Sequence, residues 1–164
     1  MTTPLLTTLF VVASMSSCSI AFASHERETS APKAGIVDYQ LSSVQFLSGH
    51  PLPGESFEVS AKTPSATQIH LLEVNATFIK ELPAEVGVEI AGSADDRECV
   101  GSECYDLSLR RATCVYDWLI ANGVSASKLQ GPRGYGTDYP IDDRDSEAGR
   151  QYNRRVQFDF VSTK

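Results

Sequence analysis

An aspartate and an arginine in the segment 92–112 have the charges and the spacing to bind one ligand from two sides. Asp95 follows the alternating apolar run 86–90, which predicts a strand, and Arg111 lies in a helical pattern that continues to Asn122. The segment between them is therefore expected to be a turn from a strand into a helix. A carboxylate and a guanidinium held apart by two rigid elements can bind a ligand that carries both an ammonium and a carboxylate group.

Apolar periodicity predicts the elements that position these two residues. Helical spacing runs from the Thr63–Pro64 start signal to Leu82, and again from Leu107 to a glycine cap at Asn122–Gly123. Alternation predicts strands at 36–49, 56–60, 86–90, within 125–139 and at 152–161, and the charged stretch 141–150 is expected to be a loop. The succession β-α-β-α-β-β predicts an α/β (α+β) sandwich, with two helices packed on one face of a mixed sheet.

The composition limits the classes of partner. The 164 residues provide one domain plus a short appendage, and 41% hydrophobic residues are enough for a packed core. The formal charge of -7 argues against nucleic-acid binding, which needs a broad basic surface. An anionic ligand must therefore be bound by a local group of arginines.

The first 35 residues have the pattern of an export leader followed by a tether. Residues 5–13 are apolar, and Ala21-Phe22-Ala23 has the small-x-small form of a cleavage site, so residues 1–23 are interpreted as a signal peptide. Cys18 offers the alternative of a lipoprotein leader with lipidation at that cysteine, and an uncleaved anchor is a third reading. Residues 24–35 are polar without period and predict a flexible tether.

Export determines how the remaining cysteines are interpreted. Cys99 and Cys104 are close enough in sequence for a disulfide across a tight loop in an oxidising compartment. Cys114 lies within the helical pattern and is expected to be a buried thiol. Three cysteines without clustered histidines do not predict a zinc site, and no metal or cofactor is expected.

Several motifs, in order, resemble the OmpA-like peptidoglycan-binding domain shared by outer-membrane protein A, the peptidoglycan-associated lipoprotein and MotB. The resemblance runs from about residue 57 to residue 160. The motifs that carry it are Gly92-Ser-Ala-Asp95, Leu107-Ser-Leu-Arg-Arg-Ala112 with Val115, Gly134-Tyr-Gly136 with Pro140, and Asn153-Arg-Arg-Val156. It implies a fold of two main helices on a mixed four-stranded sheet, with residues 55–164 as the domain and residues 36–54 as an extra strand and loop.

The resemblance also implies a function and a set of binding residues. The family binds the diaminopimelate of wall peptide stems noncovalently, which implies that Asp95 takes its ammonium and Arg111 its carboxylate. Leu107 belongs to the same motif, and Asn153, Arg154 and Arg155 correspond to a supporting cluster. Because neighbouring side chains on a strand point to opposite faces, one of the two arginines is expected to reach the site. An exported chain of this kind would lie in the periplasm, free or attached to the outer membrane, with peptidoglycan and envelope proteins as partners.

Departures from the family pattern leave alternatives open. The loop between Asp95 and Arg111 is one residue longer than usual, and Cys104 stands where the family usually has asparagine. Asp96 is therefore an alternative ammonium acceptor. Two other functions compete with wall binding: an envelope protein-interaction module of the same fold that no longer binds the wall, and a wall-modifying hydrolase. An enzyme is not expected, because adjacent carboxylates rarely face the same substrate and no histidine is placed beside a cysteine.

Overall fold

The computed structural model describes residues 40–163. The predicted signal peptide, the lipidation alternative at Cys18 and the tether at 24–35 lie outside the described residues, and their interpretation stays a prediction.

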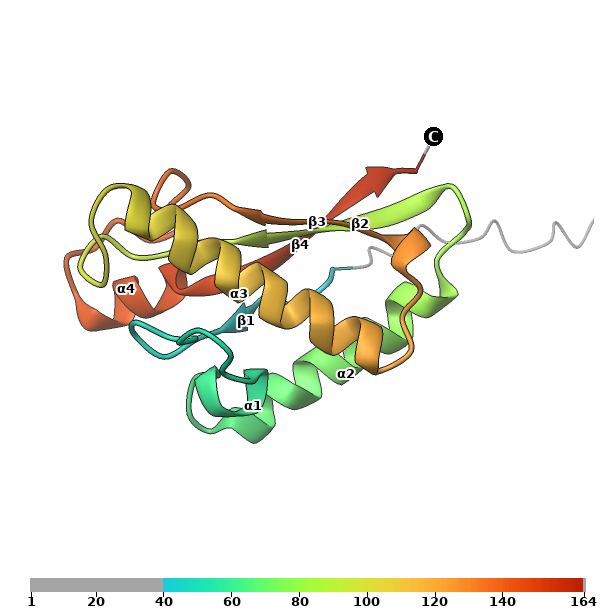
Figure 1. Cartoon of the computed structure of the whole chain (residues 1–164), viewed down its shortest axis with the longest axis horizontal. Helices are drawn as coiled ribbons and strands as arrows, with labels where there is room; N and C mark the ends of the chain where they lie inside the picture. The colour runs from blue at the N-terminus through green and yellow to red at the C-terminus, as the bar shows by residue number, and fades with distance from the viewer. Residues whose placement is uncertain (1–39, 164) are drawn as a thin grey trace, which may run out of the picture. The chain divides into compact units, whose positions relative to one another are not determined.

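Four strands form one mixed sheet in the order β1-β4-β2-β3 (Figure 1). Antiparallel pairs join β4 to both β1 and β2, whereas β2 and β3 are parallel. The outer strands are therefore β1 and β3, and β3 contains Pro132. The bounds of the strands are β1 Val44–Gln45, β2 Val86–Gly92, β3 Leu129–Gly134 and β4 Arg155–Ser162.

Two long helices cover one side of this sheet, as the sequence predicts. They are α2, Ser65–Glu81, and α3, Ser102–Ala121 (Figure 1). Short helices precede α2 and β4, namely α1, Phe57–Ser60, and α4, Glu147–Asn153, and a 3-10 turn, η1, spans Ala126–Lys128. The chain leaves α3 through Gly123, whose φ of 85° is the left-handed conformation expected of a glycine cap.

The core lies between the helices and the sheet. Val88 and Ile90 on β2 are fully buried, and they are paired with Phe160 and Phe158 on β4. Leu72 and Ile79 from α2, and Val115 and Leu119 from α3, close the core from the helical side. The alternate residues of the strands are polar, including Glu89, Gln157 and Asp159, so the other face of the sheet is turned to solvent.

The structure corrects five details of the predicted elements. Residues 57–60 form the helix α1 rather than a strand. The helix α4 occupies part of the stretch expected to be a loop and the first two residues of the strand predicted at 152–161, so that β4 begins at Arg155. Within the predicted strand 36–49, the described part has only the two residues of β1. The helix α3 begins at Ser102, five residues before the predicted start at Leu107, and Pro64 rather than Thr63 occupies the cap of α2.

In the part of the chain from 40 to 163, no helix has both the length and the apolar character that a membrane span requires.

Candidate functional site

Two glycines allow α3 to approach the ends of β2 and β3 closely. A Cβ atom at Gly92 would lie 2.0 Å from the carbonyl oxygen of Ser108, and one at Gly134 would lie 2.5 Å from the backbone nitrogen of Leu109. Both neighbours are backbone atoms that cannot rotate away. The absent side chains therefore bring the first turns of α3 against the end of β2, where Asp95 and Arg111 come close to the same turn.

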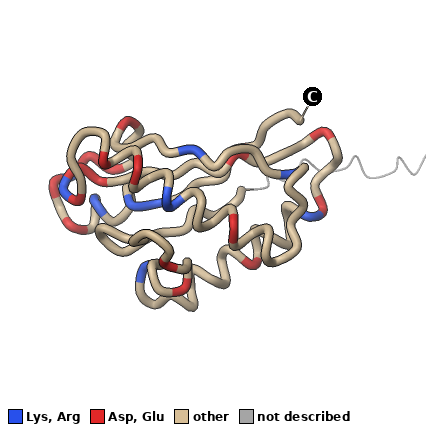
Figure 2. The backbone as a smooth tube through the Cα atoms, in the orientation of Figure 1, with Lys and Arg blue, Asp and Glu red and all other residues tan. Residues whose placement is uncertain are grey.

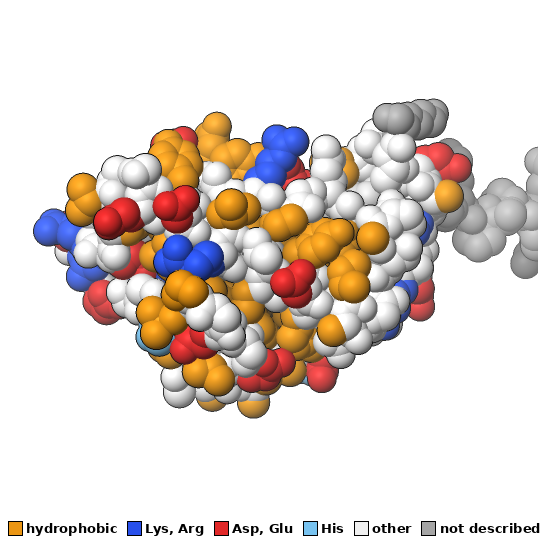
Figure 3. All heavy atoms as spheres, viewed as in Figure 1, with side chains coloured by type: hydrophobic (Ala, Val, Ile, Leu, Met, Phe, Trp, Pro, Cys, Tyr) orange, Lys and Arg blue, Asp and Glu red, His pale blue; other side chains and the backbone are white. Residues whose placement is uncertain are grey.

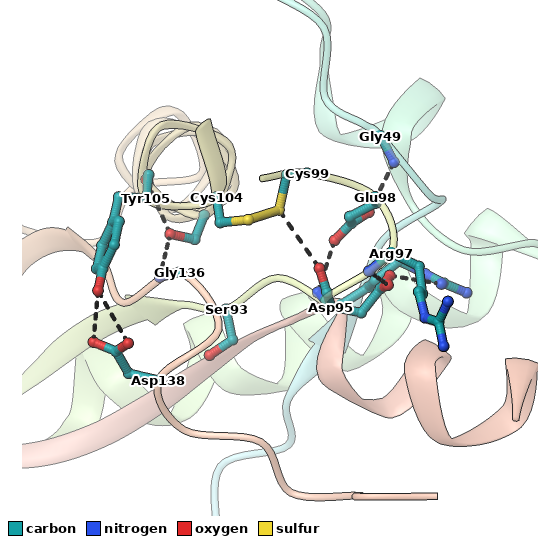
Figure 4. The surroundings of a disulfide bond; sticks show 12 residues. Gly49, Ser93, Asp95, Arg97, Glu98, Cys99, Cys104, Tyr105, Gly136 and Asp138 are labelled. Carbon is teal, nitrogen blue, oxygen red and sulfur yellow. Dashed lines mark hydrogen bonds and ion pairs between the residues drawn. A yellow bond between two sulfur atoms is a disulfide. The ribbon is translucent and has the colours of Figure 1, made fainter. Parts of the chain in front are cut away.

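Asp95 is buried, with two donors on its carboxylate. Its side chain is 1% exposed, and Oδ2 accepts a hydrogen bond of 2.9 Å from Nη1 of Arg154. Oδ1 accepts from the backbone N–H of Arg97 at 2.8 Å (Figure 4). Because two carboxylate oxygens provide about four acceptor positions, Asp95 keeps acceptor capacity for a further donor.

Arg111 is fully buried, and its contacts are made within the protein. Its Nε donates to the carbonyl oxygen of His50 at 2.9 Å. Nη1 donates to the carbonyl oxygen of Ser93 at 3.0 Å, and Nη2 donates to that of Leu47 at 3.1 Å. The guanidinium carbon also lies 5.5 Å from the centre of the Phe46 ring, within the range of a cation–π contact.

Glu98 completes the environment of Arg111, and sequence reasoning did not identify it. Its Oε1 and Oε2 accept from Nη1 and Nη2 of Arg111 at 2.6 and 2.7 Å, a bidentate ion pair with a side chain 1% exposed. The same carboxylate accepts from the backbone N–H groups of Asp95 and Gly49 at 3.0 and 2.8 Å (Figure 4). Glu98 therefore links the arginine to the segment that carries the aspartate.

A disulfide holds the turn that carries Glu98. Cys99 and Cys104 are bonded, with their Cα atoms 5.1 Å apart, and the Sγ atom of Cys99 lies 3.5 Å from the carbonyl oxygen of Asp95 (Figure 4). Beneath the disulfide, Leu107 packs with Ala94 and Cys104 in a small apolar cluster. Leu107 thus supports the turn from below and does not border the hollow beside Asp95.

Arg154 and Arg155 point in different directions. Besides Asp95, Arg154 contacts Glu147 and donates to Oε1 of Gln151 at 3.0 Å. Arg155 donates to Gln157 on the open face of the sheet and to the carbonyl oxygen of Tyr139, and burial lowers its pKa. Arg154 is therefore the arginine that contacts Asp95. It caps the end of α4, and β4 begins only at Arg155, so the alternation of side chains along a strand, on which the expectation rested, does not apply to this pair.

Asn153 fixes the segment before α4. Its Oδ1 accepts from the backbone N–H of Ile141 at 2.9 Å, and its Nδ2 donates to the carbonyl oxygen of Asp142 at 2.7 Å. These bonds place the residues after Pro140 opposite the β2–α3 turn. The amide of Asn153 is engaged in this structural role while it borders the same hollow as Asp95.

The hollow beside Asp95 has a volume of about 450 Å³ and an acidic lining. It is bordered by five carboxylates and three guanidiniums, from Asp95, Asp96, Asp142, Asp143, Asp145, Arg97, Arg144 and Arg150. Figure 2 shows acidic residues gathered at this end of the described unit, around α4 and the β2–α3 turn. The Arg144 guanidinium, which hydrogen-bonds Asp142, lowers the pKa of that carboxyl to about 2, so Asp142 stays charged. The hollow favours a cationic group over an anionic one.

The predicted residues thus divide into two groups. Asp95, Asp96 and Asn153 border the hollow, and Arg154 contacts Asp95 from behind. Arg111 is absent from the lining, because Glu98 and the backbone surround its guanidinium. Residues 40–163 contain no cluster of three or more His, Cys, Asp or Glu side chains arranged to hold a metal ion.

Known proteins share both the sequence pattern and the fold. The OmpA family profile matches residues 56–154. Outer membrane porin F of Pseudomonas fluorescens is 40% identical over 84 residues, which are 50% of this chain and 24% of the porin. A peptidoglycan-associated lipoprotein of Legionella pneumophila is 30% identical over 126 residues, covering 68% of this chain and 69% of the lipoprotein.

A solved structure supports the same grouping. The C-terminal domain of MotB from Helicobacter pylori is similar with a TM-score of 0.56 at 25% identity, over 72% of this chain and 83% of that domain. Its α/β fold with a mixed sheet agrees with the predicted fold class. Because the family profile covers more than half of the sequence and the fold agrees, this chain belongs to the OmpA family.

Proposed function

We propose that the protein binds peptidoglycan noncovalently through the diaminopimelate of the peptide stem, and so links the outer envelope to the cell wall. Membership of the OmpA family supports this function, as does similarity to a protein named peptidoglycan-associated lipoprotein. The proposed place of action is the periplasm, with the chain either free or attached to the outer membrane.

The observation that carries the proposal is the carboxylate of Asp95 at the edge of an acidic hollow. Two of its acceptor positions are used by Arg97 and Arg154, which leaves positions for the N–H groups of an ammonium ion. The hollow is large enough for the end of an amino-acid side chain and carries more negative than positive groups. We assign Asp95 the ammonium contact, and Arg154 and Asn153 the support of its surroundings.

Arg111 is connected to Asp95 only indirectly, through its ion pair with Glu98. The resemblance to the family implies that its guanidinium takes a ligand carboxylate, but Glu98 now holds that position. Its role in the proposal is to fix the turn, because Glu98 in turn accepts the backbone N–H of Asp95.

Sedimentation with purified sacculi tests the function. Wild type should sediment with the wall. Asp95→Asn, which keeps the shape and removes the charge, should reduce the bound fraction by about tenfold or more, since a charged hydrogen bond contributes about 1.5–3 kcal/mol. The matched control is Asp159→Asn on the open face of the sheet, which should sediment as wild type does.

A further variant, Asp96→Asn, tests the exposed neighbour as the acceptor. Loss of binding in Asp96→Asn with retention in Asp95→Asn would transfer the role to Asp96. Equal sedimentation of wild type and both variants would contradict the assignment of the site.

A groove between the segment 51–58 and α3 favours a second candidate function, a protein-interaction module. Leu52 and Leu109 are exposed there, and Trp118 lies beside them with Glu55 and Asp117 among the bordering residues. Figure 3 shows hydrophobic side chains gathered on this face, with acidic side chains among them. Cross-linking in intact cells separates the two functions, because an interaction module that does not bind the wall captures a protein partner and leaves sacculi unbound.

We do not propose catalysis. The free thiol of Cys114 is partly buried, and burial raises its pKa to about 11, so it stays protonated and a poor nucleophile near neutral pH. A hydrolase would release soluble muropeptides from sacculi, whereas a binding protein leaves them intact.

A further inference from the structure

The guanidinium of Arg111 has no N–H group left for a ligand. An arginine carries five N–H donors. Here Nε binds His50, Nη1 binds Ser93 and Glu98, and Nη2 binds Leu47 and Glu98. A ligand carboxylate can therefore reach Arg111 only by displacing a partner that the fold already supplies.

Glu98 is held at least as firmly as the arginine. Its two oxygens accept four hydrogen bonds, two from Arg111 and one each from the backbone of Gly49 and Asp95. The disulfide bond of the next residue, Cys99, closes the turn on the other side. Displacing Glu98 would break its ion pair with Arg111 and leave the backbone N–H groups of Gly49 and Asp95 without an acceptor, which is strongly unfavourable.

The position of Glu98 is the one that a carboxylate of the ligand would need. A bidentate contact to Nη1 and Nη2 is the preferred way for arginine to bind a carboxylate, and Glu98 makes it with the same chemical group. The ammonium half of the site is different, because Asp95 borders an open hollow with acceptor positions to spare. The three guanidiniums that border the hollow, those of Arg97, Arg144 and Arg150, are already paired with Asp145, Asp142 and Glu147. The unused charged contact of the site is therefore the carboxylate of Asp95, which favours a cation.

We propose that Glu98 takes the place of the ligand carboxylate, so that the protein selects wall stems whose ammonium-bearing centre carries a carboxamide instead of a free carboxylate. This inference rests on the proposed function and specifies its ligand as amidated diaminopimelate. A free carboxylate beside the ammonium would meet the acidic lining of the hollow, with the guanidinium of Arg111 already neutralised.

Two synthetic tripeptide stems test the inference on the full chain. Both are L-alanyl-γ-D-glutamyl-diaminopimelate, and they differ in whether the carboxyl group of the ammonium-bearing centre is free or amidated. Binding of each peptide is measured by calorimetry, and sedimentation with sacculi is measured in parallel. Wild type should bind the amide at least about tenfold more tightly than the free acid, the size of effect expected from one unpaired charge at a desolvated contact.

Variants of Glu98 test whether this residue causes the preference for the amidated peptide. Glu98→Ala exposes the Nη atoms of Arg111, and its affinity for the free acid should rise by about tenfold while that for the amide changes little. Glu98→Gln keeps the side-chain shape and should shift the preference in the same direction if the alanine variant does not fold. The control is Glu73→Ala, which removes an exposed carboxylate from α2 and should keep the wild-type preference.

The outcomes separate this inference from the function on which it rests. If wild type binds neither peptide nor sacculi, both fail. If wild type binds the free acid as tightly as the amide or more tightly, the function stands and the inference alone fails. If wild type sediments with sacculi but binds neither peptide, wall binding stands, whereas the diaminopimelate contact and the inference both fail. A folded Glu98 variant whose preference is that of wild type also overturns it.

Discussion

The two charged residues around the β2–α3 turn differ in how much of their hydrogen-bonding capacity the fold uses. On one side, Arg111 and Glu98 satisfy each other and the surrounding backbone, and both side chains are almost completely buried. On the other side, Asp95 has two donors and borders an acidic hollow. The pair of Arg111 and Glu98 therefore has no hydrogen-bond donor left for a ligand, whereas Asp95 has acceptor positions that are not used.

This difference shows that burial and charge do not identify a binding residue by themselves. Arg111 and Asp95 are equally buried and equally charged, yet the arginine has no donor left. A polar group is available to a ligand when its own partners leave some of its capacity unused. The same criterion places Arg154 behind the site, since it serves Asp95, Glu147 and Gln151 together.

The largest effect on stability is expected from breaking the buried ion pair between Arg111 and Glu98. Arg111→Met leaves the carboxylate of Glu98 buried without its partner, and the free energy of unfolding should fall by about 3–5 kcal/mol. Urea denaturation measures this change. The control is Arg97→Met, which breaks the exposed pair of Arg97 with Asp145 and should lower stability by less than about 1 kcal/mol. Equal losses in the two variants would contradict the distinction drawn between them.

The second largest effect on stability is expected at Gly92, where α3 lies close to the end of β2. Gly92→Ala places a Cβ atom 2.0 Å from a backbone oxygen of α3, and we expect a loss of about 3 kcal/mol, the upper range for overpacking. Thermal unfolding with wall sedimentation measures stability and site geometry together. Gly87→Ala is the matched variant, because its closest contact is the side-chain methyl of Thr163, which can rotate away. A loss in Gly87→Ala as large as in Gly92→Ala would argue against the close approach as the cause.

Removing the disulfide of the β2–α3 turn should lower stability by a smaller amount. The double variant Cys99→Ser, Cys104→Ser frees a loop with a sequence separation of 5. Closure of a loop of this length stabilises the folded state by about 2 kcal/mol in the chain-entropy treatment. Urea denaturation of wild type with and without reductant should give the same difference, and Cys114→Ser should show the same response to reductant as wild type. An unchanged midpoint in the double variant would show that the contacts of Glu98 hold the turn without the bond.

The smallest effect is a pH dependence on the side of Asp95. The hydrogen bond from Arg154 lowers the pKa of Glu147 below its usual value of 4.5. A lowered folded-state pKa means that the contribution of Glu147 to stability is present above pH 4.5 and is lost as the pH falls through the lowered value. The melting temperatures of wild type and Glu147→Gln should therefore differ by a constant amount above pH 4.5 and should converge as the pH falls below the lowered pKa. Glu73→Gln on α2 is the control and should leave the melting curve unchanged.

The sequence predicted the long elements because their signals are local. The periodicities of α2, β2 and β4 lie within single segments, and each element is found in the predicted region, although β4 begins three residues after the predicted start at 152. The short helices were missed for different reasons. Residues 57–60 alternate apolar and polar, which favours a strand, but one helical turn buries Phe57 and Ser60 and leaves Val59 exposed. The start of α4 does carry a local signal, the cap at Ser146, whose side chain accepts a hydrogen bond from the backbone N–H of Gly149.

The positions of Asp95 and Arg111 around one turn were also predictable, but their separate environments were not. The partner of Arg111 is a residue of the turn itself, and it is oriented by the N–H of Gly49, far away in sequence. No local pattern reports such a contact. The composition of the lengthened turn carries the only signal, because it contains three acidic residues, Asp95, Asp96 and Glu98, any of which could pair with an arginine.

Both outer strands of the sheet offer little to the edge of another chain. At one edge β1 has only two residues, and at the other Pro132 interrupts β3 without a backbone N–H to donate. Strand-by-strand aggregation needs a long, unbroken row of free backbone groups, which neither border supplies. Pairing of two copies through the edges of this sheet is therefore not expected.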